Sequence, residues 1–141
     1  MVQKLKNMTK EQLKNLVYQV NGAAIEVHKA LGAGLLESVY HKCLKHELFL
    51  RDIHFQSEMV VPVHYKDIDV EAELRCDLFI ENILVVELKA IEKVLPIHEV
   101  QLLTYMKLLE VPMGLMLNFH CINIFKEGQK TYINELYRTF L

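Results

Sequence analysis

The sequence predicts a mixed α/β (α+β) fold, with helices flanking a central mixed sheet in the order α-α-β-β-β-α-β and further strands at the C-terminal end. Apolar residues recur every three or four positions up to about residue 51, and every second position from about residue 59. The 141 residues are 52% hydrophobic and 24% charged, which suits one domain with one core. We therefore expect a single domain over residues 1–141, with residues 1–10 as a flexible N-terminus.

Two helices are expected first. In the first helix, Thr9 and Gln12 form a capping-box pattern, and Gly32-Ala33-Gly34 ends the helix. Its apolar stripe is Leu13, Leu16, Val17, Val20, Ala24, Val27 and Leu31. The second helix is expected from Leu36 to Arg51, and its apolar side is Leu36, Val39, Tyr40, Cys43, Leu44 and Leu48.

Strands follow, because the apolar period changes to two. Residues 59–64 alternate, and Pro62 among them indicates an edge strand or a bulge. After a turn at Lys66-Asp67, one strand is expected from Val70 to Ile80. Its two faces are Val70, Ala72, Leu74, Cys76, Leu78 and Ile80 on one side, and Glu71, Glu73, Arg75, Asp77 and Phe79 on the other.

The second half continues with a turn at Glu81-Asn82 and a strand over residues 83–90 that is apolar enough to be buried on both sides. A helix is expected from Pro96 to Glu110, and Pro112 ends it. Residues 113–125 are expected to give two strands, followed by a turn at residues 127–130 and a last strand over residues 131–133.

Charge and cysteine content exclude several classes of protein. The net charge is −2, so the chain is not a uniformly basic nucleic-acid coat. Residues 1–51 carry +4 and residues 52–141 carry −6, which fits either ordinary surface variation or a cation-binding carboxylate site beside a basic surface. Three separated cysteines exclude a disulfide framework and a four-cysteine metal site. With no apolar run of about 18 residues and no signal peptide, we expect a cytoplasmic protein without membrane contact.

Asp77, Glu87 and Lys89 are unusual because they are charged residues on or beside a strand that is otherwise apolar. Two nearby carboxylates favour a hard divalent cation with oxygen ligands, although a structural ion-pair group is the alternative. Both carboxylates share a face only if Asp77 pairs with Glu87, which places Ile80 opposite Leu84 and leaves a three-residue loop. A two-residue loop would put the carboxylates on opposite faces.

The same residues resemble a known signature. Asp77, nine residues and then Glu87-Leu88-Lys89 resemble the PD-(D/E)XK nuclease motif, with Cys76 at the proline position. Residues 34–40 (GLLESVY) match the motif of the GxxExxY family, a bacterial and archaeal branch of that superfamily. Further matches extend the resemblance from about residue 11 to residue 135, namely Val27-His28, Leu31-Gly32, residues 101–105, Gly114-Leu115 and Asn118-Phe119. The resemblance implies a restriction-endonuclease-like core.

The resemblance also implies roles for individual residues. Glu37, Asp77 and Glu87 would hold Mg²⁺ or Mn²⁺, with the backbone carbonyl of Leu88 as a further ligand. Lys89 would position or deprotonate the attacking water and steady the phosphate. Gln101, Tyr105 and His98 would border the site.

Simpler explanations stay open for several of these residues. Glu37 also suits the first turn of a helix through the helix dipole, and Gln101 and Tyr105 could be a polar helix stripe. His28 fits a buried core histidine better than a metal ligand.

The leading hypothesis is a metal-dependent nuclease that hydrolyses phosphodiester bonds, with DNA favoured over RNA. The alternative is a non-catalytic nucleic-acid- or protein-binding module that retains the nuclease fold, and a structural protein without a ligand ranks third. A homodimer is left open, because an apolar patch could lie between two copies and a duplex cutter needs two sites.

Overall fold

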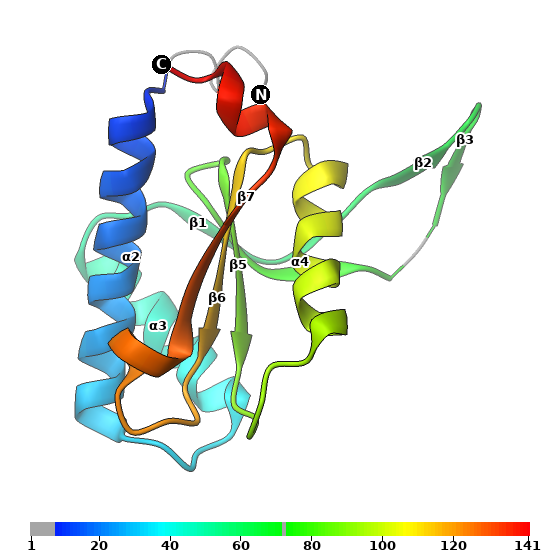
Figure 1. The fold of residues 1–141 in the computed structure, drawn as a ribbon. Coiled ribbons are helices and arrows are strands. Elements are labelled where there is room, and N and C mark those ends of the chain that lie inside the picture. Colours follow the sequence, from blue (N-terminus) through cyan, green and yellow to red (C-terminus); the bar gives the residue numbers. More distant parts are fainter. Residues whose placement is uncertain (1–7, 72) are drawn as a thin grey trace.

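The computed structural model describes residues 8–71 and 73–141. A five-stranded mixed sheet has the strand order β1-β4-β5-β6-β7, with helices α2 and α3 on one side and α4 on the other (Figure 1). The elements are α2 (Lys10–Leu31), α3 (Glu37–Leu50), β1 (Phe55–Val60), β2 (Val63–Tyr65), β3 (Ile68–Val70), β4 (Arg75–Ile80), β5 (Leu84–Lys89), α4 (Pro96–Leu108), β6 (Met113–Asn118), a π-helical turn η1 (Ile124–Gly128), β7 (Gln129–Ile133) and a 3-10 helix η2 (Glu135–Thr139). This confirms the mixed α/β class.

Helix α2 begins and ends where the sequence predicts. The Thr9 side chain accepts the backbone N–H of Gln12, and the Gln12 side chain accepts the N–H of Thr9. Gly32 ends the helix with a positive φ of 71°. Of the N-terminal residues 1–10, Thr9 and Lys10 belong to this cap and first turn, and residues 1–7 lie outside the described part.

Helix α3 buries Tyr40, Leu44 and Leu48 as predicted. Leu36 is instead the N-cap residue and is 74% exposed, because the chain turns before the helical stripe begins.

The hairpin of β4 and β5 has the register on which the carboxylate hypothesis depends. Ile80 pairs with Leu84 and Leu78 pairs with Val86, so the loop has three residues. Glu81 and Asn82 in this loop have φ values of 52° and 55°. The Glu81 carboxylate accepts the N–H of His54 at 2.8 Å, which ties the loop to the start of β1.

The single strand predicted from Val70 to Ile80 is wrong. The chain forms two strands there, because β3 pairs with β2 in a separate two-stranded arm, whereas β4 enters the main sheet between β1 and β5. Figure 1 shows this arm projecting from the body. Pro62 lies between β1 and β2, so the chain leaves the main sheet there. The prediction for Ala72 falls outside the described residues.

The second strand predicted within residues 113–125 is also wrong. Only β6 is a strand; residues 119–123 are irregular, and η1 follows. A Cβ atom on Gly128 would lie 2.3 Å from the carbonyl oxygen of Asn118, so this turn packs against the end of β6 as only glycine allows. Gln129 and Lys130, expected in a turn, belong to β7.

Strand β5 is central and buried on both faces from Leu84 to Leu88, as predicted. It runs parallel to β6, and α4 connects the two strands. Across residues 8–71 and 73–141, each helix is too short or too polar to cross a lipid bilayer.

Candidate active site

The site lies where β4 and β5 separate. Their ladder ends at the pair Leu78–Val86, and Asp77 and Glu87 follow in the same register. The N–H of Asp77 donates to Glu87 Oε2 at 2.8 Å, and the N–H of Leu88 donates to Asp77 Oδ2 at 2.8 Å. Each carboxylate therefore accepts an N–H of the opposite strand where the regular ladder stops. We call this opening, with Asp77 and Glu87 on it, the carboxylate fork.

Strand β1, on the other side of β4, also does not pair with Asp77. The pairing between β1 and β4 runs from Ser57–Leu78 to Met59–Cys76 and skips the opposed residues Glu58 and Asp77. Glu58 has a positive φ of 51°, which is unfavourable for a residue with a side chain. This local distortion leaves the N–H of Asp77 free to bond Glu87. Nothing in the sequence pattern signals it.

Electrostatics separate Glu87 from an ordinary surface glutamate. Burial and, after it, the negative charge of Asp77 raise the pKa of Glu87 to about 8, although the charge of Lys89 acts in the opposite direction. The pKa of Glu37, the first residue of α3, is raised by burial and by Asp77, again against Lys89. The structure thus brings Glu37, Asp77, Glu87 and Lys89 close enough for their charges to act on one another.

These residues suit a divalent cation by their chemistry. Three carboxylates against one lysine leave an excess of negative charge, and hard cations such as Mg²⁺ take carboxylate oxygens. In the described part of the chain, no three His, Cys, Asp or Glu side chains are already gathered as a metal site. Glu37, at the start of α3, has an exposed surface, although its carboxyl is buried enough to raise its pKa.

The glycine and tyrosine of the 34–40 motif position Glu37. Gly32 and Gly34 have φ values of 71° and 96°, and the hydroxyl of Tyr40 donates to the carbonyl of Gly32 at 2.6 Å. The same hydroxyl accepts the N–H of Leu35, and the Tyr40 ring stacks on Phe119 with centroids 4.5 Å apart. The loop before α3 is therefore fixed to the core, a role for Tyr40 that the sequence did not suggest.

Helix α4 covers the face that carries the site. A Cβ atom on Gly114 would lie 2.7 Å from Met106 of α4, and Gly114 pairs with Val85. Side chains alternate along a strand, so Glu87 and Lys89 lie on the same face as Val85. Tyr105 of α4 is 5% exposed, and its pKa is raised by burial and then by Glu87, Cys76 and Asp77, which places it beside the carboxylate fork.

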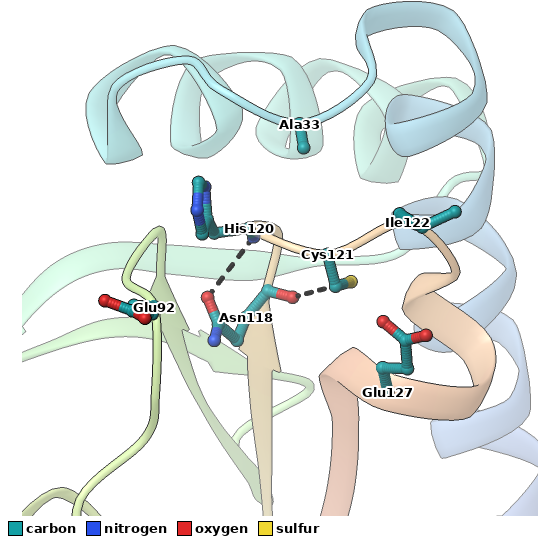
Figure 2. A pocket seen from close by; sticks show the side chains of 7 residues that line it. All are labelled: Ala33, Glu92, Asn118, His120, Cys121, Ile122 and Glu127. Atoms are coloured by element: carbon teal, nitrogen blue, oxygen red, sulfur yellow. Dashed lines mark hydrogen bonds between the residues drawn. The ribbon is translucent and has the colours of Figure 1, made fainter.

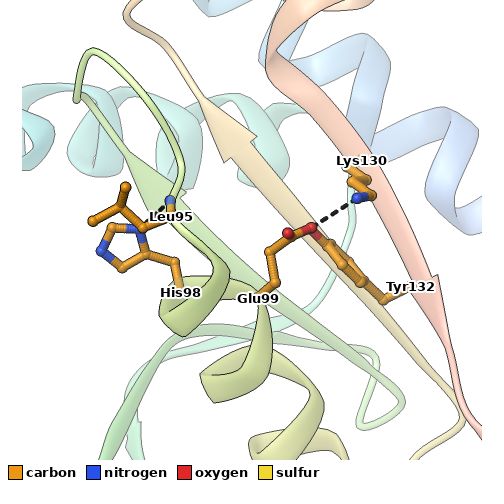
Figure 3. Close-up of polar contacts among 5 residues, drawn as sticks. All are labelled: Leu95, His98, Glu99, Lys130 and Tyr132. Carbon is orange, nitrogen blue, oxygen red and sulfur yellow. Dashed lines mark hydrogen bonds and ion pairs between the residues drawn. The ribbon is translucent and has the colours of Figure 1, made fainter.

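Other residues expected at the border of the site have different surroundings. Gln101 lies one turn before Tyr105 and is exposed. His98 caps α4, because its Nδ1 accepts the N–H of Leu95 at 2.9 Å (Figure 3). His28 is buried, and its Nε2 donates to the carbonyl of Cys121 at 2.9 Å, as expected for a core histidine.

Two residues beside the site were not singled out for a role in it from the sequence. Asn118 pairs in register with Lys89, and its side-chain amide bonds both the N–H and the carbonyl of Ile91, which fixes the chain just after Lys89. Burial and the charges of Glu87 and Asp77 raise the pKa of Cys76 to about 12, so this thiol stays neutral and is a poor nucleophile. A polar residue at the end of an apolar strand was the available signal for Asn118.

The fold and the site together define a class of α+β proteins in which two carboxylates and a lysine lie where adjacent strands of a mixed sheet separate. The chain belongs to the PD-(D/E)XK nuclease superfamily, whose family model matches residues 14–131, including Glu37, Asp77, Glu87 and Lys89. Comparisons with curated proteins and with solved structures gave no match. Membership indicates a nuclease, for which nucleic acid is the substrate.

Proposed function

We propose that this protein is a Mg²⁺- or Mn²⁺-dependent nuclease that hydrolyses phosphodiester bonds, with DNA preferred over RNA. The observation that carries the proposal is the carboxylate fork, with Lys89 on the same face and Glu37 coupled to it. Membership of the PD-(D/E)XK superfamily supports the reaction class. The preference for DNA rests on the resemblance described above.

Asp77, Glu87 and Glu37 would hold the cation. The N–H of Leu88 points to Asp77, and the carbonyl of a strand residue points to the same side as its N–H, so the Leu88 carbonyl also faces the fork. This direction supports Leu88 as a fourth ligand. When bound, a divalent cation polarises the scissile phosphate and lowers the pKa of water.

The other residues act on the phosphate and the water. Lys89 offers a positive charge and N–H donors to phosphate oxygens that gain charge in the transition state. Tyr105 keeps its hydroxyl proton, since its pKa is raised, and its ring forms an apolar wall that limits access of bulk water. Asn118 holds the backbone after Lys89 and so keeps that side chain beside the fork.

A second copy of the chain is the partner we propose for the outer face of α4. Ile97 and Val100 are 65% and 54% exposed there, although the opposite side of the same helix is buried in the core. A two-fold axis would bring this exposed apolar face against the same face of the second copy. A monomer in sedimentation at micromolar concentration would exclude this dimer.

The cleavage experiment compares the wild type with Asp77→Asn and Lys89→Ala on single- and double-stranded DNA and RNA, with Mn²⁺ or with EDTA. We expect metal-dependent cleavage that falls about 10²–10³-fold or more in both variants. Lys14→Ala is the matched control, because Lys14 is an exposed lysine near the start of α2, on the other side of the sheet from α4.

Two results would contradict the proposal. Equal residual activity in the wild type and both site variants indicates a contaminating nuclease. Salt-dependent DNA binding by a pure wild type that never cleaves indicates the non-catalytic binding module, which the lack of a ready-made three-ligand cluster among residues 8–71 and 73–141 favours as the second candidate.

A further inference from the structure

A pocket of 390 Å³ opens at the end of β6, where Asn118 pairs in register with Lys89 (Figure 2). We call it the β6 pocket, because β6 and the loop after it form its floor. Its lining residues are Ala33, Glu92, Asn118, His120, Cys121, Ile122 and Glu127. Its volume is in the lower part of the range typical of small-ligand sites, which is roughly 300–1,000 Å³.

The walls of the β6 pocket continue the segments that build the site. Asn118 pairs in register with Lys89, and Glu92 follows Lys89 by three residues. Ala33 lies in the Tyr40-anchored loop that leads to Glu37. The pocket therefore lies at the end of the β5–β6 pair that carries Lys89, on the path expected for the nucleotides next to a phosphate at the fork.

The residues that line the β6 pocket disfavour binding of a phosphate group. Glu92 and Glu127 are exposed carboxylates and lie at opposite sides of Asn118 and Cys121 in Figure 2. Both are hydrogen-bond acceptors and repel anions. The Asn118 amide is already bonded to Ile91, and the pKa of Cys121 is raised by burial and by Glu127, so the thiol stays neutral.

The lining also offers a flat surface. The ring of His120 is exposed at the mouth of the pocket, where a planar group can stack on it. A planar, uncharged group with hydrogen-bond donors on its edge can donate to Glu92 or Glu127 and stack on the ring of His120.

We propose that the β6 pocket holds an unpaired nucleobase that carries an exocyclic amino group, with Glu127 or Glu92 accepting from that amino group. Carboxylates accept from cytosine N4 in this way, whereas thymine presents an acceptor oxygen at the same position. The inference rests on the proposed function in taking nucleic acid as the ligand. It adds a base preference and a demand for unpaired substrate.

The experiment measures binding in EDTA, where no cleavage occurs. Labelled single-stranded oligonucleotides of deoxycytidine or of deoxythymidine are titrated by anisotropy with the wild type, Glu127→Gln, Glu92→Gln and Glu26→Gln. We expect the wild type to bind the deoxycytidine strand about tenfold more tightly. That preference should shrink in at least one of the two pocket variants and persist in Glu26→Gln, which changes an exposed glutamate of α2.

Equal affinity for both strands, or a preference that survives in Glu127→Gln and Glu92→Gln, would overturn the pocket assignment. Displacement of a labelled lysine-rich peptide from the wild type but not from Glu127→Gln would indicate a basic protein partner and would also overturn it. The cleavage assay with Lys89→Ala tests the nuclease proposal separately. If the protein cleaves DNA but shows no base preference, only the pocket assignment is wrong. If it does not cleave at all, the nuclease proposal itself is wrong.

Discussion

Two glutamates near α4 have opposite surroundings. Glu99, in the first turn of α4, accepts from Lys130 Nζ at 2.7 Å and from the hydroxyl of Tyr132 on β7 (Figure 3). These hydrogen bonds lower the pKa of Glu99, first through Lys130 and then through Tyr132. Glu87 faces another carboxylate, Asp77, and its pKa is raised to about 8 by burial and by that charge.

The difference indicates a structural role for Glu99 and supports the functional role proposed for Glu87. The negative charge of Glu99 is balanced by Lys130 of the same chain, and the contact joins α4 to β7, so Glu99 needs no ligand. The carboxylate fork and Glu37 together set three carboxylates against Lys89, so their negative charge is incompletely balanced. Raised pKa values at paired carboxylates are typical of functional sites, because the arrangement costs stability unless a cation binds there.

The largest expected effect is on metal binding. Calorimetric titration of Mn²⁺ should show binding to the wild type that Asp77→Ala abolishes and Glu99→Gln leaves unchanged. At about one hundred times the dissociation constant, the ion should stabilise the wild type by about 2.7 kcal/mol, seen as a rise in Tm. Asp77→Ala should show no such rise.

Two results would remove the contrast between the glutamates. Mn²⁺ binding that persists in Asp77→Ala and disappears in Glu99→Gln would move the cation site to β7. No binding to the wild type, even with a short DNA present, would leave the fork as a structural carboxylate pair.

For the paired carboxylates, the sequence could give only a condition, because strand geometry has a period of two: a three-residue loop sets Asp77 opposite Glu87, and a two-residue loop does not. The structure has the three-residue loop. Lys89 follows from the same period. Glu37 could be found only through the 34–40 motif, since a glutamate in the first turn of a helix has a sufficient local explanation.

The residues that shape the site were not predictable, because they act through contacts between distant segments. Tyr40 reaches Phe119, and Asn118 reaches Ile91. Alternation from Val70 to Ile80 is the same for one strand or two, so it could not show that the chain changes sheets near residue 71. The close approach of Gly128 to Asn118 similarly turned an expected strand into η1.

The second prediction uses pH and has opposite signs for the two glutamates. Without divalent ions, the stabilising effect of protonated Glu87 is complete below its ordinary pKa of 4.5 and is lost as the pH rises through about 8. Glu87→Gln keeps an oxygen for the N–H of Asp77, so it should stabilise the protein at pH 8 by on the order of 1–3 kcal/mol and little at pH 4. Chemical denaturation at both pH values measures this.

Glu99→Gln is the matched comparison. The lowered pKa of Glu99 contributes stability that is present above 4.5 and is lost as the pH falls, so this variant should be destabilised at pH 7 and near neutral at pH 3. If both variants changed the free energy of unfolding in the same direction at neutral pH, the two glutamates would not have opposite surroundings.

The smallest expected effect tests whether the Glu99 contact is only structural. Tyr132→Phe removes one hydroxyl that donates to Glu99 and leaves Lys130 in place, so Tm should fall by about 3 °C. The metal-dependent cleavage rate should change less than twofold, because α4 is also packed on β6 through Gly114 and Met106, which keeps Tyr105 beside the fork. A loss of cleavage as large as that expected for Lys89→Ala would mean that β7 sets the geometry of the fork through α4. The two glutamates would then belong to one functional unit.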